Sequence, residues 1–147
     1  MTAIFGAIAP SDRFVVGMGF ASAATADEII ALLDSCLAAC HLDSHQLLAI
    51  GTHMRKQTSP LLLPVALHFG VPMRLFDADD LRDAGPGVAD AVAGLAGPLH
   101  LRKTKSDFGT CAIARCAPGF SLAGFGQPYS ANAPIAAATL LTSIAGP

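Results

Sequence analysis

An unbroken apolar run, FVVGMG, follows Arg13 and ends at Gly19, and it constrains the fold of this chain more than any other feature. A half-exposed strand alternates apolar and polar residues, whereas a strand buried on both faces does not. The run therefore predicts a strand covered by helices on both sides, as in layered α/β proteins. With 147 residues, the chain has room for one such domain and its core.

The segment after this strand predicts a helix and then a second, parallel strand. Thr25 and Glu28 have the spacing of a capping box, in which both side chains bind free amides of the first helical turn. Apolar residues then recur every three or four positions to about residue 40, and a further buried strand is expected at 47–51. Strand, helix and strand make a right-handed parallel unit.

The rest of the chain continues to alternate helices and strands. We expect helices at 60–69 after a Ser59 cap, at a short segment capped by Asp77 and Asp80, and at 88–95, with strands at 71–76, 99–101 and 110–115. Gly70 should end the first of these helices, and Pro64 should kink or limit it because proline lacks an amide donor. The last strand follows a basic loop at 102–109 and is expected to be antiparallel.

The predicted fold class is α/β: a single layered domain, residues 1–118, with a small mixed β-sheet flanked by helices on both faces. Residues 119–147 are rich in glycine, proline and alanine without clear periodicity, which predicts a loose C-terminal extension. Within it, residues 136–144 could form a short helix that docks on the domain or on another protein.

The composition argues against several classes of function. The net charge is −2, whereas nucleic-acid-binding domains usually carry a basic excess, so no nucleic-acid partner is expected. Every apolar run is interrupted before it reaches the length of a membrane span, and no basic residue precedes Arg13 as in a secretory signal. We therefore expect a cytoplasmic protein without a membrane partner.

The four cysteines are expected to be buried, reduced thiols. Cys36 and Cys40 lie one helical turn apart, and Cys111 and Cys116 follow later, but neither pair has the CxxC spacing of a metal site. No metal site and no cofactor are predicted.

The glycines that end the first strand suggest an anion site, although they do not form a nucleotide motif. Gly17 and Gly19 match the first two positions of a dinucleotide fingerprint, but Ser22 stands where the third glycine belongs. No acidic residue follows the second strand, and no phosphate-binding Gly-Lys-Ser or Gly-Lys-Thr is present. Either the glycines let backbone amides approach an anion near the helix that starts at Thr25, or they only permit a tight turn.

Basic residues gather in two predicted loops, which hold five of the nine lysines and arginines: Arg55, Lys56, Arg102, Lys103 and Lys105. At one edge of the sheet they would form a cationic rim for carboxylates or a phosphate; otherwise they are solvated surface. His53 and His100 adjoin these loops and could transfer protons, although such histidines are more often structural. No convincing pair of nucleophile and base is present.

Several short motifs, in their order and spacing, resemble one known family. They are 15–19 (VVGMG), 25–29 (TADEI), 50–52 (IGT) with Lys56, 70–72 (GVP) with Phe76 and Leu81, and Lys103 and Lys105 before 110–114 (TCAIA). Over residues 13–116 the chain resembles the CobE and CbiG C-terminal-domain family of cobalamin biosynthesis, most closely its stand-alone CobE type. It departs from the family pattern at Ser59, where a glutamate is common, and at Asp90 in place of another glutamate.

The resemblance implies a layered α/β fold and a corrinoid ligand with a rim of carboxylates. An accessory or carrier protein would bind a precorrin or a hydrogenobyrinic-acid-like intermediate, and other cobalamin-pathway enzymes are possible partners. The expected ligand-binding residues are Gly17, Gly19, Thr25, Thr52, Arg55, Lys56, Lys103, Lys105 and Ser106. The alternative is a CbiG-like hydrolase of a precorrin lactone or extruded acyl group, with His53 moving a proton and Lys56 or Lys103 stabilising an oxyanion. A third possibility is a structural subunit that docks through its apolar tail.

Overall fold

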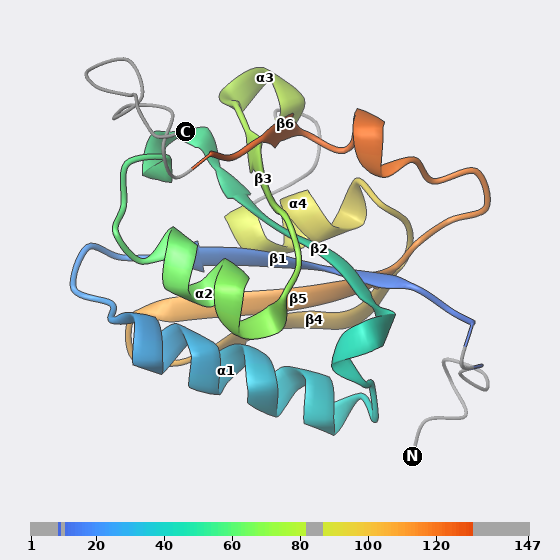
Figure 1. Ribbon diagram of the computed structural model, residues 1–147, viewed down its shortest axis with the longest axis horizontal. Coiled ribbons are helices and arrows are strands. Elements are labelled where there is room, and N and C mark those ends of the chain that lie inside the picture. Colours follow the sequence, from blue (N-terminus) through green and yellow to red (C-terminus); the bar gives the residue numbers. More distant parts are fainter. Residues whose placement is uncertain (1–8, 10, 82–86, 131–147) are drawn as a thin grey trace, which may run out of the picture.

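The computed structural model describes residues 9, 11–81 and 87–130, and within them one mixed sheet organises the chain (Figure 1). The strands are β1 (Phe14–Phe20), β2 (Leu47–His53), β3 (Met73–Phe76), β4 (Leu99–Lys105), β5 (Gly109–Arg115) and β6 (Gln127–Pro128). The helices are α1 (Ala26–Ala39), α2 (Leu62–Phe69), α3 (Ala78–Leu81) and α4 (Val88–Gly94), with single 3-10 turns η2 (Ser44–Gln46), η3 (Met54–Lys56) and η4 (Leu122–Gly124).

The strand order β4-β5-β1-β2-β3-β6 places β1 in the interior of the sheet. β1, β2 and β3 are parallel, whereas β5 is antiparallel to β1, β4 to β5, and β6 to β3. The mixed sheet and the antiparallel strand near 110–115 are therefore confirmed.

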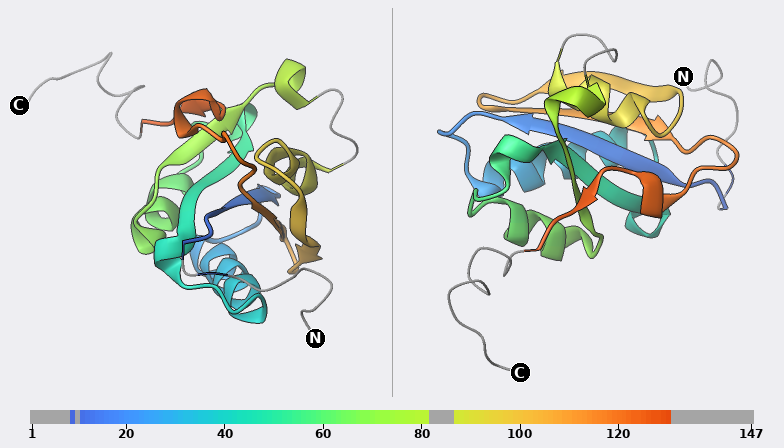
Figure 2. Two further views of the ribbon diagram at one scale, coloured as in Figure 1. Left: turned by 90° about the vertical axis from the view of Figure 1, so that its right-hand side faces the viewer. Right: turned by 90° about the horizontal axis from the view of Figure 1, so that it is seen from above.

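Helices cover both faces of the sheet, as the unbroken apolar run predicted. Figure 2 shows α1 and α2 on one side and α4 on the other. Val16 packs in the core beneath α1 and α2, while its neighbour Val15 packs in the core beneath α4, and both side chains are fully buried. Adjacent residues of one strand thus enter separate cores, which is why no polar residue alternates along β1.

The second long helix starts later than the sequence predicted. α2 begins at Leu62, and the Ser59 hydroxyl instead accepts a hydrogen bond from the Leu61 amide at 3.3 Å. Pro64 consequently lies in the first turn, where an amide has no partner within the helix, so of the two expected effects the proline limits the start of the helix. Gly70 ends the helix with φ 68°, in the left-handed region that favours glycine, as predicted.

The basic segment that follows α4 is a strand and not the loop predicted at 102–109. β4 extends to Lys105 and pairs with β5 through two register irregularities, so Arg102, Lys103 and Lys105 lie on an edge strand. Charged side chains on an edge strand disfavour pairing with a second chain, which suits this position. Only residues 106–108 connect β4 to β5.

The residues just after 118 pack on the sheet. Arg74 on β3 donates from its guanidinium to the carbonyls of Phe125 (2.6 Å) and Gly126 (3.1 Å). Phe125 is 4% exposed, and its ring centroid lies 4.7 Å from that of Phe76. The expected helix at 136–144 lies outside the described residues. No helix in the described part of the chain is long and apolar enough to cross a membrane.

Candidate ligand-binding site

The carboxyl ends of β1 and β2 meet the β4–β5 hairpin at one edge of the sheet, which we call the carboxyl edge. Phe20, the last residue of β1, pairs with Gly109, the first of β5, so the β1–α1 loop and the hairpin are neighbours. Both lie at the left-hand end of the sheet in Figure 1. Open α/β sheets usually bind their ligands outside the carboxyl ends of their parallel strands.

Two hollows open on the carboxyl edge. The hairpin pocket, about 320 Å³, is lined by Gly19, Phe20, Ala21, Arg55, Val88 and residues 105–110. The loop pocket, about 340 Å³, is lined by residues 20–22, Ala24, Lys56 and residues 58–61. Phe20 and Ala21 line both pockets and therefore form the ridge between them.

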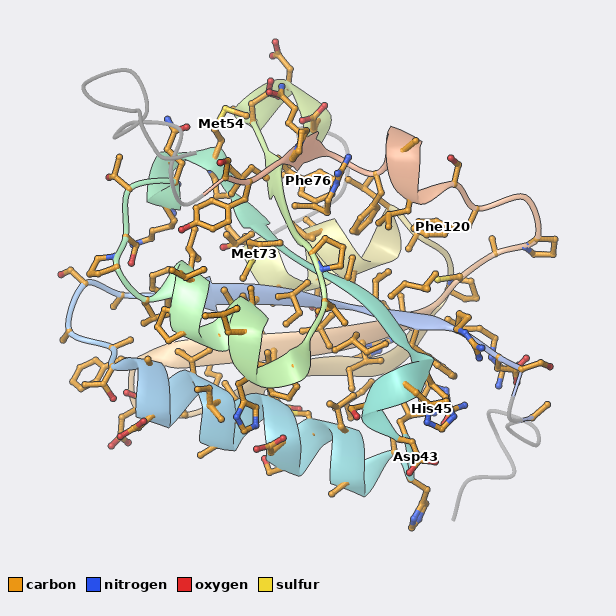
Figure 3. All side chains as sticks on the ribbon, viewed as in Figure 1. Asp43, His45, Met54, Met73, Phe76 and Phe120 are labelled. Carbon is orange, nitrogen blue, oxygen red and sulfur yellow. The ribbon has the colours of Figure 1, made fainter. Side chains whose placement is uncertain are left out.

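A larger hollow, of about 500 Å³, lies elsewhere, between α4 and the segment that carries η4. Its aromatic lining includes Phe76 and Phe120, both labelled in Figure 3, together with Phe125. Among the residues that the structure describes, no lysine, arginine or histidine lines it. The described cations at a pocket are therefore those of the carboxyl edge.

Cations and aromatic rings lie together at the carboxyl edge. The Lys56 ammonium lies 4.9 Å from the centroid of the Phe20 ring, a cation–π contact. Arg55 and Lys105 are exposed on the hairpin pocket, and Phe108 beside them is 47% exposed. This edge can therefore contact a molecule that is both apolar and acidic.

The η3 turn places the two basic residues that follow β2, Arg55 and Lys56, at different pockets. The Nδ1 atom of His53 accepts a hydrogen bond from the Arg55 amide at 3.1 Å and caps the turn. Arg55 then lines the hairpin pocket while Lys56 lines the loop pocket. Burial and the positive charge of Arg55 lower the pKa of His53, opposed by Asp77, so a neutral imidazole serves as the acceptor.

Glu28 fixes the hairpin to the start of α1. The Thr25 hydroxyl caps the helix by accepting from the Glu28 amide at 3.1 Å, as predicted. The Glu28 carboxylate accepts from the Ser106 hydroxyl (2.5 Å) and the Phe108 amide (2.7 Å). The second half of the predicted capping box therefore does not form, because this carboxylate binds the hairpin.

Some residues expected at the ligand face the protein interior. A Cβ on Gly17 would lie 2.2 Å from the Ala89 carbonyl oxygen, so this glycine lets α4 approach β1 and does not lie in a turn. Thr52 is fully buried, and its hydroxyl donates to the Met18 carbonyl at 2.9 Å, joining β2 to β1. Ser106, by contrast, lines the hairpin pocket, where its hydroxyl donates to Glu28 and accepts from the Gly109 amide at 3.1 Å.

Gly19 lines the hairpin pocket, and Lys103 lies beside it. Gly19 lines the pocket from the end of β1. The Lys103 amide donates to the Asp90 carboxylate at 2.8 Å, and its Nζ lies 3.6 Å from where a Cβ on Gly87 would stand. Lys103 thus adjoins the pocket without lining it, and Asp90, which departs from the family pattern, joins the start of α4 to β4.

The sequence predicted the cations but not the aromatic residues between them. Phe20 could have been suspected, because it continues the apolar run beyond Gly19 to the carboxyl end of the strand. Phe108 and the role of Glu28 carried no such signal, because each depends on the hairpin folding back against α1. His100 is 5% exposed and lies edge-on to Phe14 with ring centroids 5.2 Å apart, so it belongs to the core.

Three of the four thiols lie in the core beneath α1, whereas Cys116 packs against the core beneath α4. Cys36, Cys40 and Cys111 are buried and all four cysteines are free. A hydrogen bond with Cys111 lowers the pKa of Cys36 to about 7, against the opposing effect of burial. In the described ranges, no group of three or more histidine, cysteine or acidic side chains is placed to hold a metal ion.

A mixed sheet covered on both faces by helices makes this chain a small layered α/β domain, with cations and two pockets at its carboxyl edge. The family model described as cobalamin synthesis G C-terminus matches residues 14–114. The chain belongs to this family, which confirms the resemblance to the CobE and CbiG C-terminal-domain family, and it is a cobalamin biosynthesis protein of that type.

Solved structures of cobalamin proteins share the fold. CobE, a protein from the cobalamin (vitamin B12) biosynthetic pathway, superposes with a TM-score of 0.64 at 20% identity, over 76% of this chain and 96% of that chain. Cobalamin biosynthesis protein chiG from Agrobacterium tumefaciens str. C58 gives 0.58 at 20% identity, over 71% and 98%. A cobalamin biosynthesis protein G homolog from Sulfolobus solfataricus gives 0.61 at 22% identity, over 72% of this chain and 37% of that one. No curated protein matches the chain by sequence.

Proposed function

We propose that this protein binds a corrinoid precursor, a precorrin or a hydrogenobyrinic-acid-like intermediate, at its carboxyl edge as an accessory or carrier protein. The observation that carries the proposal is the set of cations, Arg55, Lys56 and Lys105, that line two open pockets, both of which Phe20 also lines. Such intermediates combine an apolar macrocycle with carboxylates on its rim. Lysine and arginine bind carboxylates, and the aromatic ridge offers apolar contact.

The experiment is a titration of the purified protein with a series of pathway intermediates, followed by their visible spectra. At least one intermediate should bind with a saturable spectral change. Lys56→Ala and Lys105→Ala should each weaken its binding by about three- to tenfold, with the larger loss at low salt, because exposed charges are screened as salt rises.

Arg102→Ala is the matched control for these variants. Arg102 is an exposed cation on the same strand as Lys105, but it lines neither pocket. Its loss should change the affinity by less than twofold. Absence of binding by the unaltered protein, or equal effects of all three variants, would contradict the proposal.

The CbiG-like hydrolase has less support from the site. His53, its expected proton carrier, caps η3 through Nδ1 and lines neither pocket, and Lys103 adjoins the hairpin pocket from outside. The same titration tests this alternative, because turnover of a lactone intermediate that is lost in His53→Asn would favour it over simple binding.

A further inference from the structure

The ridge between the two pockets is fixed in place. The Ala21 amide donates to the Phe108 carbonyl at 2.8 Å, and the Ala21 carbonyl accepts from the Ala24 amide at 3.0 Å. Phe20 is held by its pairing with Gly109. The ridge is therefore a preformed feature of the carboxyl edge, and the exposed methyl group of Ala21 lets a flat surface approach it closely.

Cations stand on both sides of this ridge. Arg55 and Lys105 line the hairpin pocket, and Lys56 lines the loop pocket. The only acidic side chain that lines either pocket, among the residues that the structure describes, is the exposed Asp107 in the hairpin. An anionic ligand thus meets positive charge on each side and a small apolar surface between.

The size of the pockets favours one ligand across both. Each hollow, at about 320 and 340 Å³, is near the lower limit of small-molecule sites, which span roughly 300–1,000 Å³. A tetrapyrrole carries its acidic side chains around the whole ring, so its carboxylates point in opposite directions. Seating the ring in one pocket would leave the cations of the other pocket unused.

We propose that a single polycarboxylate tetrapyrrole lies across the ridge over Ala21, with carboxylates of one side at Lys56 and those of the opposite side at Arg55 and Lys105. This inference rests on the proposed function and narrows it. The site selects a ring with acidic groups on opposite sides, and small acids that reach only one pocket bind weakly.

The test uses uroporphyrin, a planar tetrapyrrole with carboxylates on every pyrrole ring, followed by its fluorescence. Ala21→Trp should place bulk on the ridge and weaken uroporphyrin binding at least tenfold, because the ring can no longer reach both pockets. Ala23→Trp is the matched control, since Ala23 is exposed in the same loop but lines neither pocket, and it should change the affinity less than twofold. One uroporphyrin should bind per chain.

A second pair of variants repeats the test with charge in place of bulk. Ala21→Asp should repel the carboxylates and weaken binding, whereas Ala23→Asp should do so much less, and neither exposed site has a side chain that the fold needs. Unchanged affinity in both Ala21 variants, or two ligands per chain, would overturn the shared placement and leave binding at the carboxyl edge standing. No uroporphyrin binding by the unaltered protein, together with none of the pathway intermediates, would overturn the proposed function as well.

Discussion

The two hydrogen bonds between the Glu28 carboxylate and the β4–β5 hairpin should contribute measurably to stability, and Glu28→Ala tests this contribution. The variant removes the acceptor of two hydrogen bonds, one from the Ser106 hydroxyl and one from the Phe108 amide. It also removes a negative charge from the first turn of α1, where the helix dipole favours one. The hairpin carries Lys105, so the same change should loosen one wall of the hairpin pocket.

The magnitude follows from how exposed the donors are. Hydrogen bonds to a charged group contribute about 1.5–3 kcal/mol when well shielded. Phe108 is 47% exposed and Ser106 is partly exposed, so water can replace much of each bond, and we take about 1 kcal/mol for each. Adding about 0.5 kcal/mol for the helix dipole gives a total loss of about 2–3 kcal/mol in the free energy of unfolding.

Asp27→Ala separates the hairpin bonds from the dipole effect. Asp27 is exposed in the same first turn, so its removal loses a similar dipole contribution while the hairpin bonds remain. Urea denaturation should show Glu28→Ala less stable than Asp27→Ala by about 1.5–2.5 kcal/mol, with hydrogen exchange of the Phe108 amide faster only in the former. Equal stability of the two variants, with unchanged Phe108 exchange, would refute this account of Glu28.

Two further predictions concern packing and pH. Gly17→Ala should destabilise the protein by about 2–3 kcal/mol in urea denaturation, because the new Cβ would meet the Ala89 carbonyl at 2.2 Å. Gly94 lies in α4 with open space around it, so Gly94→Ala should be neutral or should stabilise the protein by up to about 1 kcal/mol. Equal effects of the two substitutions would contradict the close approach of α4 to β1. Burial, and then the charge of Arg115, lower the pKa of His100, so the unfolded chain binds the proton more tightly than the folded protein does. The free energy of unfolding should therefore fall as the pH drops below about 6.5. His100→Gln should flatten this pH dependence, and an unchanged pH dependence would refute its attribution to His100.

The order of elements could be predicted because local signals agreed with the tertiary structure. The capping threonine, Gly70 and the reciprocal Asp77–Asp80 bonds, at 2.9 and 3.0 Å, all lie at element ends where the backbone itself demands those residues. The limits of β4 and α2 were wrong for a different reason. Lysines favour a loop on composition alone, yet pairing with β5 extends β4 to Lys105, and that pairing is not visible in the segment itself.

The positive charge of the candidate site could be predicted from the sequence, but the other residues that line its pockets could not. The clustering of lysines and arginines is visible in the sequence itself, and the structure places Arg55, Lys56 and Lys105 at the two pockets of the carboxyl edge. A glycine or a threonine, by contrast, can serve either a ligand or the core. Gly17 and Thr52 were assigned to the ligand, although α4 covers the first and the Met18 carbonyl binds the second.

The position of α4 explains why this ambiguity could not be resolved from the sequence. α4 crosses β1 so closely that only glycine fits at 17, and its first residue, Val88, thereby lines the hairpin pocket beside Gly19. Gly17 therefore lets α4 pack against the strand, whereas Gly19 borders the pocket, although the two glycines are two residues apart and lie on the same face of β1. Which glycine meets a ligand depends on where along β1 the helix begins, and that is determined by contacts between distant segments such as the Lys103–Asp90 bond.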